Sequence, residues 1–84
     1  MYEVYLERHA ERDLKSLPTD IFQRIIPHIK GLANNPRPSG SKKLTGSKHD
    51  WRIRVGDYRV IYEISDKEKL IRVMGVRHRK EVYR

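Results

Sequence analysis

The sequence predicts a single α+β domain, in which an N-terminal strand and two helices precede a mostly antiparallel sheet of three to four strands, with the helices on one face. Two patterns predict this class. Apolar residues at helical spacing fill much of the first half, and runs that alternate apolar and polar residues follow one another in the second half. A chain of 84 residues buries one modest core, so we expect one domain over residues 1–84.

The first half supplies one strand and the helix pair. Residues 2–7 alternate apolar and polar side chains, which predicts a half-buried strand. Residues 10–17 place alanine and leucine at helical spacing before Pro18, which predicts a short amphipathic helix. An apolar stripe over residues 21–33 predicts the second helix. We expect Pro27 to kink or break it, and we keep one bent helix because the stripe continues in phase on both sides.

The segment WRIRVGDYRVIYEI, residues 51–64, predicts a β-hairpin, since apolar residues recur at every second position on both sides of a Gly-Asp turn. If the apolar set packs into the core, Arg52 and Arg54 face solvent together, and Arg59 lies close by across the turn. Strands often show charged residues to water for solubility alone. Three like charges this close repel one another unless an anion binds, so we favour an anion-binding surface.

The segments around the hairpin complete the predicted sheet. Residues 37–50 read as a basic loop with a short strand at residues 43–45. Residues 70–76 are apolar enough for a strand that is covered on both faces. Gly75 marks a bulge or a close approach in that strand, which leaves the direction of Arg77 open by one residue.

The excess positive charge is concentrated in two segments of a chain whose formal net charge is +8. Residues 37–59 hold seven Lys or Arg against two Asp, and residues 72–84 hold five against one Glu. Two basic blocks beside strands indicate one positive surface for a polyanion such as RNA or DNA. The expected RNA-binding residues are Lys42, Lys43, Lys48, His78, Arg79 and Lys80.

Composition excludes several other classes of protein. The chain has no cysteine, which rules out a disulfide framework or a thiolate zinc site and agrees with a cytoplasmic protein. No apolar run is long enough for a transmembrane helix or a signal peptide, so we expect no membrane partner. The four histidines lack metal-ligand spacing, and we expect neither a metal nor a cofactor.

The chain resembles the RelE/ParE superfamily of toxins from toxin–antitoxin pairs over nearly its whole length. The resemblance is carried by the opening strand, the helix pair ending in ANNP, the LTG element, WRIRVGDYRVIYEI and the final GVRHRKEVY. The arginine and terminal tyrosine positions resemble the RelE branch. This resemblance implies a type II toxin that is a ribosome-dependent endoribonuclease, cuts mRNA in the ribosomal A site, and is held inactive by an acidic, RelB-like antitoxin. The catalytic positions that it implies are Arg52, Arg54, Arg59, Arg77 and Tyr83.

The implied reaction needs alignment, charge stabilisation and proton transfer, because RNA supplies its own nucleophile, the 2′-hydroxyl. Arg52, Arg54 and Arg59 would hold the scissile phosphate, since guanidinium matches phosphate geometry. Arg77 would lie near the leaving 5′-oxygen.

The general base is left open by the sequence. The family often has lysine before the turn, whereas Arg52 and Arg54 cannot lose a proton. Tyr83 would either stack against an RNA base or take the 2′-hydroxyl proton. It is the first candidate for the general base, because clustered cations lower the pKa of a phenol. His78 comes next, and His49 is a further alternative.

Two other functions fit the same features. A ParE-like poison of DNA gyrase would share the fold without needing a nuclease site. A non-catalytic nucleic-acid-binding module would use the arginines to bind phosphates and would leave the RNA intact.

Overall fold

The computed structural model describes residues 1–82, and the side chains of residues 1–80. The elements follow in the order β1 (Glu3–Leu6), α1 (Arg8–Lys15), α2 (Thr19–Gly31), β2 (Lys42–Lys43), β3 (Asp50–Val55), β4 (Tyr58–Ser65), β5 (Leu70–His78) and α3 (Arg79–Val82). The predicted α+β class is confirmed, with an N-terminal strand, a helix pair and consecutive strands.

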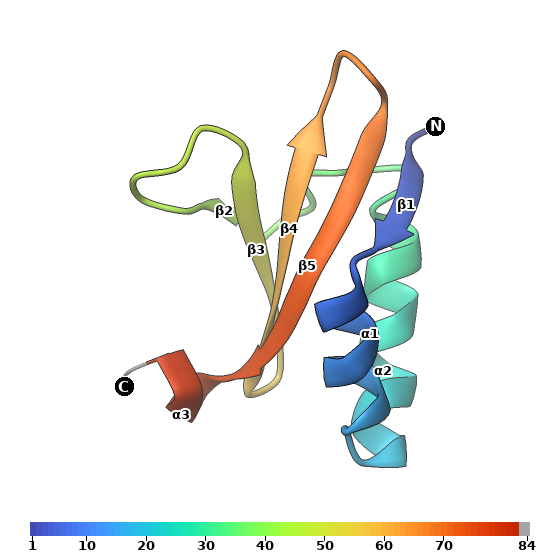
Figure 1. Ribbon diagram of the computed structural model, residues 1–84, viewed down its shortest axis with the longest axis vertical. Coiled ribbons are helices and arrows are strands. Elements are labelled where there is room, and N and C mark those ends of the chain that lie inside the picture. The colour runs from blue at the N-terminus through green and yellow to red at the C-terminus, as the bar shows by residue number, and fades with distance from the viewer. Residues whose placement is uncertain (83–84) are drawn as a thin grey trace.

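The five strands form one sheet in the order β1-β5-β4-β3-β2. β1 pairs in parallel with β5, and the other pairs are antiparallel. The parallel pair follows from the helix pair, because α1 and α2 carry the chain away from β1 before the hairpins begin. Figure 1 shows α1 and α2 side by side, with α1 beside the lower part of β5 and α3 well apart from both.

One face of the sheet packs on the helices and forms the core. Alternate residues of β3 and β4, among them Val55 and Val60, pack with Leu14 of α1 and Ile25 of α2. Burying one such side chain contributes about 1.5–3 kcal/mol. The residues between them on the strands point to the opposite side, which we call the open face.

Three details differ from the sequence prediction. β2 covers Lys42–Lys43, so it begins one residue and ends two residues before the expected strand at residues 43–45, because the chain turns at residues 45–46, where Gly46 has a φ of +84°. The bulge of β5 lies at Met74, one residue before Gly75. The one-turn helix α3 was not predicted. α2 runs as one helix through Pro27, as predicted from the apolar stripe that continues in phase on both sides of this proline.

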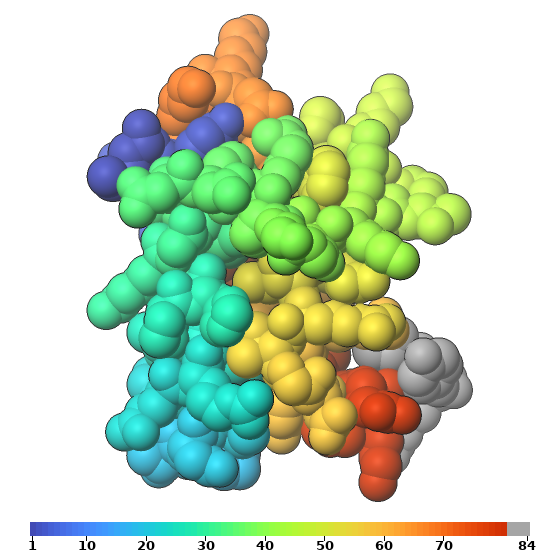
Figure 2. Space-filling view, turned by 180° about the vertical axis from the view of Figure 1, so that it is seen from behind, coloured from blue at the N-terminus to red at the C-terminus, as the bar shows by residue number. Residues whose placement is uncertain are grey.

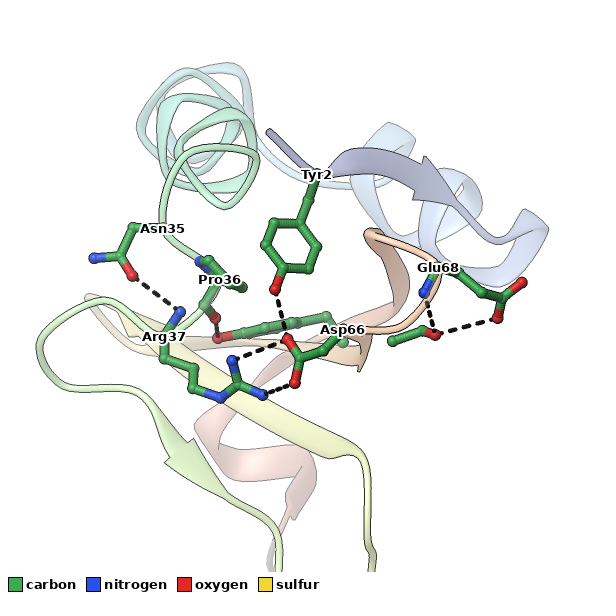
Figure 3. Close-up of polar contacts among 8 residues, drawn as sticks. Tyr2, Asn35, Pro36, Arg37, Asp66 and Glu68 are labelled. Atoms are coloured by element: carbon green, nitrogen blue, oxygen red, sulfur yellow. Dashed lines mark hydrogen bonds and ion pairs between the residues drawn. The ribbon is translucent and has the colours of Figure 1, made fainter.

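The end of the sheet near the β4–β5 turn is tied together by polar contacts (Figure 3). Tyr2 donates its hydroxyl to Asp66 (2.5 Å), and the Arg37 guanidinium donates to both oxygens of the same carboxylate (2.8 and 3.3 Å). Buried Tyr62 donates its hydroxyl to the Pro36 carbonyl (2.7 Å). These bonds join β1, the loop after α2 and the β4–β5 turn, and we call this region the anchored end.

Candidate nucleic-acid interface

Three arginines form a row across the open face. Arg54 pairs with Arg59, and Arg59 pairs with Arg77, on the neighbouring strands β3, β4 and β5. Among residues 1–80, no carboxylate oxygen lies within 4 Å of a nitrogen of these guanidinium groups. Like charges directly opposite one another destabilise a sheet. The arginine row therefore costs stability unless an anion lies over it.

A small hollow lies beside this row at the β3–β4 turn. It has a volume of about 180 Å³ and is lined by Arg54, Gly56, Asp57, Tyr58, Arg59 and Arg79. We call it the turn pocket. Three of its six lining residues are arginines, so it suits a phosphate group.

Arg79 reaches the turn pocket because α3 begins against the turn. Its backbone N–H donates to the Asp57 carbonyl (2.7 Å), and its Nη1 lies 3.6 Å from Asp57 Oδ1. Gly56 permits the turn, since its φ of +60° lies in the left-handed region. The turn thus fixes a third guanidinium that comes from outside the hairpin.

The alternation of β3 predicts that Arg52 faces solvent, and this prediction is wrong. Only 8% of its surface is exposed, and its Nη1 donates to the Gly40 carbonyl (3.3 Å). Figure 2 shows the green loop before β2 lying directly against the yellow atoms of β3. Burial lowers the pKa of Arg52, and the charges of Arg54 and Arg59 lower it further. The alternation of β3 is correct, but sequence alone does not reveal a loop that folds over one of its two arginines.

The structure separates the three lysines. Lys42 pairs with Arg52 and lines a hollow of about 370 Å³ with Arg52 and Arg54. Lys43 pairs with Trp51 and therefore points away from the open face. Lys43 and Lys48 line a different hollow of about 480 Å³ toward the anchored end.

The remaining candidate site residues also lie in different parts of the structure. His78 pairs with Tyr58 on the side of the sheet opposite the arginine row, and the two rings meet edge to face at 5.0 Å. Its Nδ1 accepts the backbone N–H of Lys80 (3.1 Å), whose side chain is exposed. His49 lines the hollow toward the anchored end. Tyr83 lies outside the described residues.

Arg79, which the sequence places among the expected RNA-binding residues and outside the catalytic set, lines the turn pocket together with Arg54 and Arg59. A two-residue turn fixes the pairing of Arg54 with Arg59, so that part was predictable from the sequence. The bulge at Met74 brings Arg77 into line, and no local sequence signal fixes its position. Within the described part of the chain, no group of three or more His, Cys, Asp or Glu could hold a metal ion. No helix found there is long and apolar enough to cross a membrane.

Comparison with known proteins gives a consistent assignment. The family model for the ParE toxin of the type II toxin–antitoxin system parDE matches residues 4–83. The chain is 32% identical to toxin RelE of Mycobacterium tuberculosis, over 99% of this chain and 87% of that protein. It is 28% identical to putative toxin RelE1 of Methanocaldococcus jannaschii, over 99% and 96% of the two chains.

Solved structures agree with these matches. A chain of the archaeal RelE–RelB complex from Pyrococcus horikoshii aligns with a TM-score of 0.82 and 31% identity, over 93% of this chain and 94% of that chain. The isolated Escherichia coli RelE toxin aligns with a TM-score of 0.82 at 22% identity, over 99% and 92% of the two chains, which supports the fold. The fold and these matches define a toxin of a type II toxin–antitoxin system. The chain belongs to the RelE/ParE superfamily, in its RelE branch.

Proposed function

We propose that the protein is a ribosome-dependent endoribonuclease that acts in the cytoplasm and cuts mRNA in the ribosomal A site. The observation that carries this proposal is the arginine row, which presents guanidinium groups without carboxylate partners among residues 1–80, next to a pocket lined by a further arginine. The relatives named toxin RelE and toxin RelG support the assignment as a toxin, of which this activity is the proposed form.

The chemistry follows from where the cations lie. In this proposal the 2′-hydroxyl gives up its proton and attacks the adjacent phosphorus, and the bond from phosphorus to the 5′-oxygen of the next nucleotide breaks. The products are a cyclic phosphate and a 5′-hydroxyl, which takes its proton from water. Arg54 and Arg59 hold the scissile phosphate and stabilise the charge that grows on its non-bridging oxygens. Arg77, at the end of the row, lies beside the leaving oxygen. Arg79 completes the phosphate site from α3.

Arg52 takes a supporting part in this proposal. Its guanidinium is buried under the loop and is bonded to the Gly40 carbonyl. It therefore positions this loop and adds positive potential to the site rather than contacting the phosphate.

We propose Tyr83 as the general base that takes the 2′-hydroxyl proton. Clustered cations favour the ionised form of a nearby phenol, which is the form that accepts a proton. His78 fits this part less well, because it pairs with Tyr58 on the side away from the arginine row. A Tyr83→Phe variant that cleaves as fast as the wild type would remove Tyr83 from the mechanism.

We also propose an acidic, RelB-like antitoxin as the partner, with mRNA and the ribosome as targets. Solved structures similar to this chain are complexes of RelE with RelB from P. horikoshii and Methanococcus jannaschii. An acidic segment over the open face would neutralise the arginine row. Co-expression with the product of a neighbouring reading frame should restore growth to cells that the toxin arrests.

The decisive experiment maps cleavage on a translated message. We expect purified protein to cut mRNA in a translating extract, with ends visible by primer extension, and to leave the same RNA intact without ribosomes. Arg77→Gln should weaken the cuts strongly, though no more than Arg59→Gln. Arg72→Gln is the matched control, since Arg72 lies on the same strand and face but is paired with Glu7 (3.4 Å) and Glu63 (3.8 Å).

The matching family model is that of a ParE toxin, so a ParE-like inhibitor of DNA gyrase is the alternative function. A supercoiling assay separates the two functions. Inhibition of gyrase together with an uncut message would replace the nuclease proposal. RNA that is bound but never cut would instead indicate a non-catalytic binding module.

A further inference from the structure

Arg24 places another guanidinium against the β3–β4 turn, from the helix side. A Cβ atom built on Gly56 would lie 3.4 Å from Arg24 Nη2 and 3.7 Å from its Nη1. The Arg24 guanidinium therefore lies within van der Waals range of the turn, which the left-handed φ of Gly56 permits. α2 therefore carries an exposed cation directly to the turn that separates Arg54 from Arg59.

A hollow of about 140 Å³ lies beside Arg24 and is lined by Ile21, Arg24, Val55, Gly56, Asp57 and Tyr58. It shares three residues with the turn pocket, namely Gly56, Asp57 and Tyr58. Because Arg54 belongs to the open face and Arg24 to α2, the two hollows lie on opposite sides of one turn. A bound polyanion that extends from the turn pocket around this turn would therefore reach Arg24 next.

The charges around the turn favour a polyanion that spans both hollows over a single small anion. No carboxylate among residues 1–80 comes within 4 Å of the Arg24 guanidinium. The one acid of the turn, Asp57, is directed to Arg79 (3.6 Å). Ile21 and Tyr58 add apolar surface beside Arg24, which suits a sugar or the face of a base.

We propose that the RNA strand whose phosphate occupies the turn pocket continues around the hairpin turn, places a neighbouring phosphate on Arg24, and rests its sugar and base on Ile21 and Tyr58. This inference rests on the proposed nuclease function and extends its substrate site from the open face to α2. Arg24 acts there as a substrate-binding residue and takes no part in proton transfer.

The salt dependence of RNA binding tests this inference directly. The probe is a single-stranded RNA oligonucleotide with 2′-O-methyl groups, which remove the nucleophile so that binding is measured without cleavage. Each lost phosphate contact should reduce the slope of log affinity against log salt by about 0.7. We expect this reduction for Arg24→Gln and for Arg54→Gln, and we expect Arg24→Lys to retain the slope of the wild type.

Arg8→Gln is the matched control, because it removes the same charge from an exposed site at the start of α1. An unchanged slope for Arg24→Gln would overturn the inference, and so would an equal reduction for Arg8→Gln, which would indicate a net-charge effect. Matching thermal midpoints verify that each variant is folded. Cleavage of a translated message reports on the proposed function separately, so a normal Arg24→Gln slope beside intact wild-type cleavage would remove only the Arg24 contact.

Discussion

The two ends of the sheet treat their arginines in opposite ways. At the anchored end, Arg37 is bonded to Asp66, and farther along on the open face Arg72 lies within 4 Å of Glu7 and Glu63. At the opposite end, near the β3–β4 turn, Arg54, Arg59 and Arg77 are aligned across three strands. The side chains of residues 1–80 offer them no carboxylate within 4 Å. Arg72 and Arg77 belong to one strand and one face, so secondary structure does not cause this difference. Internal pairing stabilises one end, whereas the arginines of the other end have no carboxylate partner among the described side chains.

Arg59→Gln should have the largest effect on activity, because Arg59 is the centre of the arginine row. Loss of one fixed donor to a developing negative charge should reduce the cleavage rate by about 100-fold. Quantified primer extension on a translated message measures the rate, and Arg72→Gln should stay within a few-fold of the wild type. Equal losses in both variants would show that the two ends of the sheet do not differ in function.

Much of the fold could be predicted from the sequence because its signals are local. Alternation fixes the hairpin, and helical spacing fixes α1 and α2. The pairing of Arg54 with Arg59 follows from the two-residue turn. The burial of Arg52 could not be predicted in this way, since it depends on the loop at Gly40 meeting β3 through a long-range contact. The position of Arg79 likewise depends on α3 starting against Asp57.

Tyr62→Phe tests whether the anchored end contributes to stability and not to cleavage. The hydroxyl of Tyr62 donates to the Pro36 carbonyl, and Tyr62 is fully buried, so its loss should destabilise the protein by about 1–2 kcal/mol. Urea unfolding monitored by circular dichroism measures this change. Cleavage by the folded variant should be unaffected, since the arginine row lies at the other end of the sheet. A large loss of cleavage without a loss of stability would contradict this separation.

The same tyrosine gives the anchored end a pH dependence in base. Burial raises the pKa of Tyr62 to about 12, above the usual value of about 10 in an unfolded chain. A raised folded-state pKa contributes stability that is fully present below about pH 10 and is lost as pH rises toward 12. Unfolding free energies measured from pH 8 to pH 12 should therefore fall more steeply for the wild type than for Tyr62→Phe.

Arg59→Gln should also stabilise the protein slightly, which distinguishes the two ends by stability alone. Relief of repulsion between directly paired cations should contribute about 0.5 kcal/mol. Arg72→Gln should instead destabilise by up to about 1 kcal/mol, because it removes surface ion pairs. Urea midpoints at low salt compare the variants, and the same sign of change in both would contradict the proposed difference between the ends.

The smallest expected effect concerns Asp66 in acid. Hydrogen bonds from Arg37 and then from Tyr2 lower the pKa of Asp66 to about 2. A lowered folded-state pKa contributes stability above the unfolded value of about 3.9, and this contribution is lost as pH falls toward 2. The side chain is exposed, so the contribution is small. Asp66→Asn should therefore unfold with a slightly weaker dependence on pH between about 4 and 2 than the wild type, in urea titrations at fixed ionic strength. The arginine row should respond differently, because its arginines keep their charge throughout this range. Phosphate should therefore raise the thermal midpoint of both proteins equally at pH 4. A smaller rise in Asp66→Asn would mean that the anchored end and the arginine row are coupled.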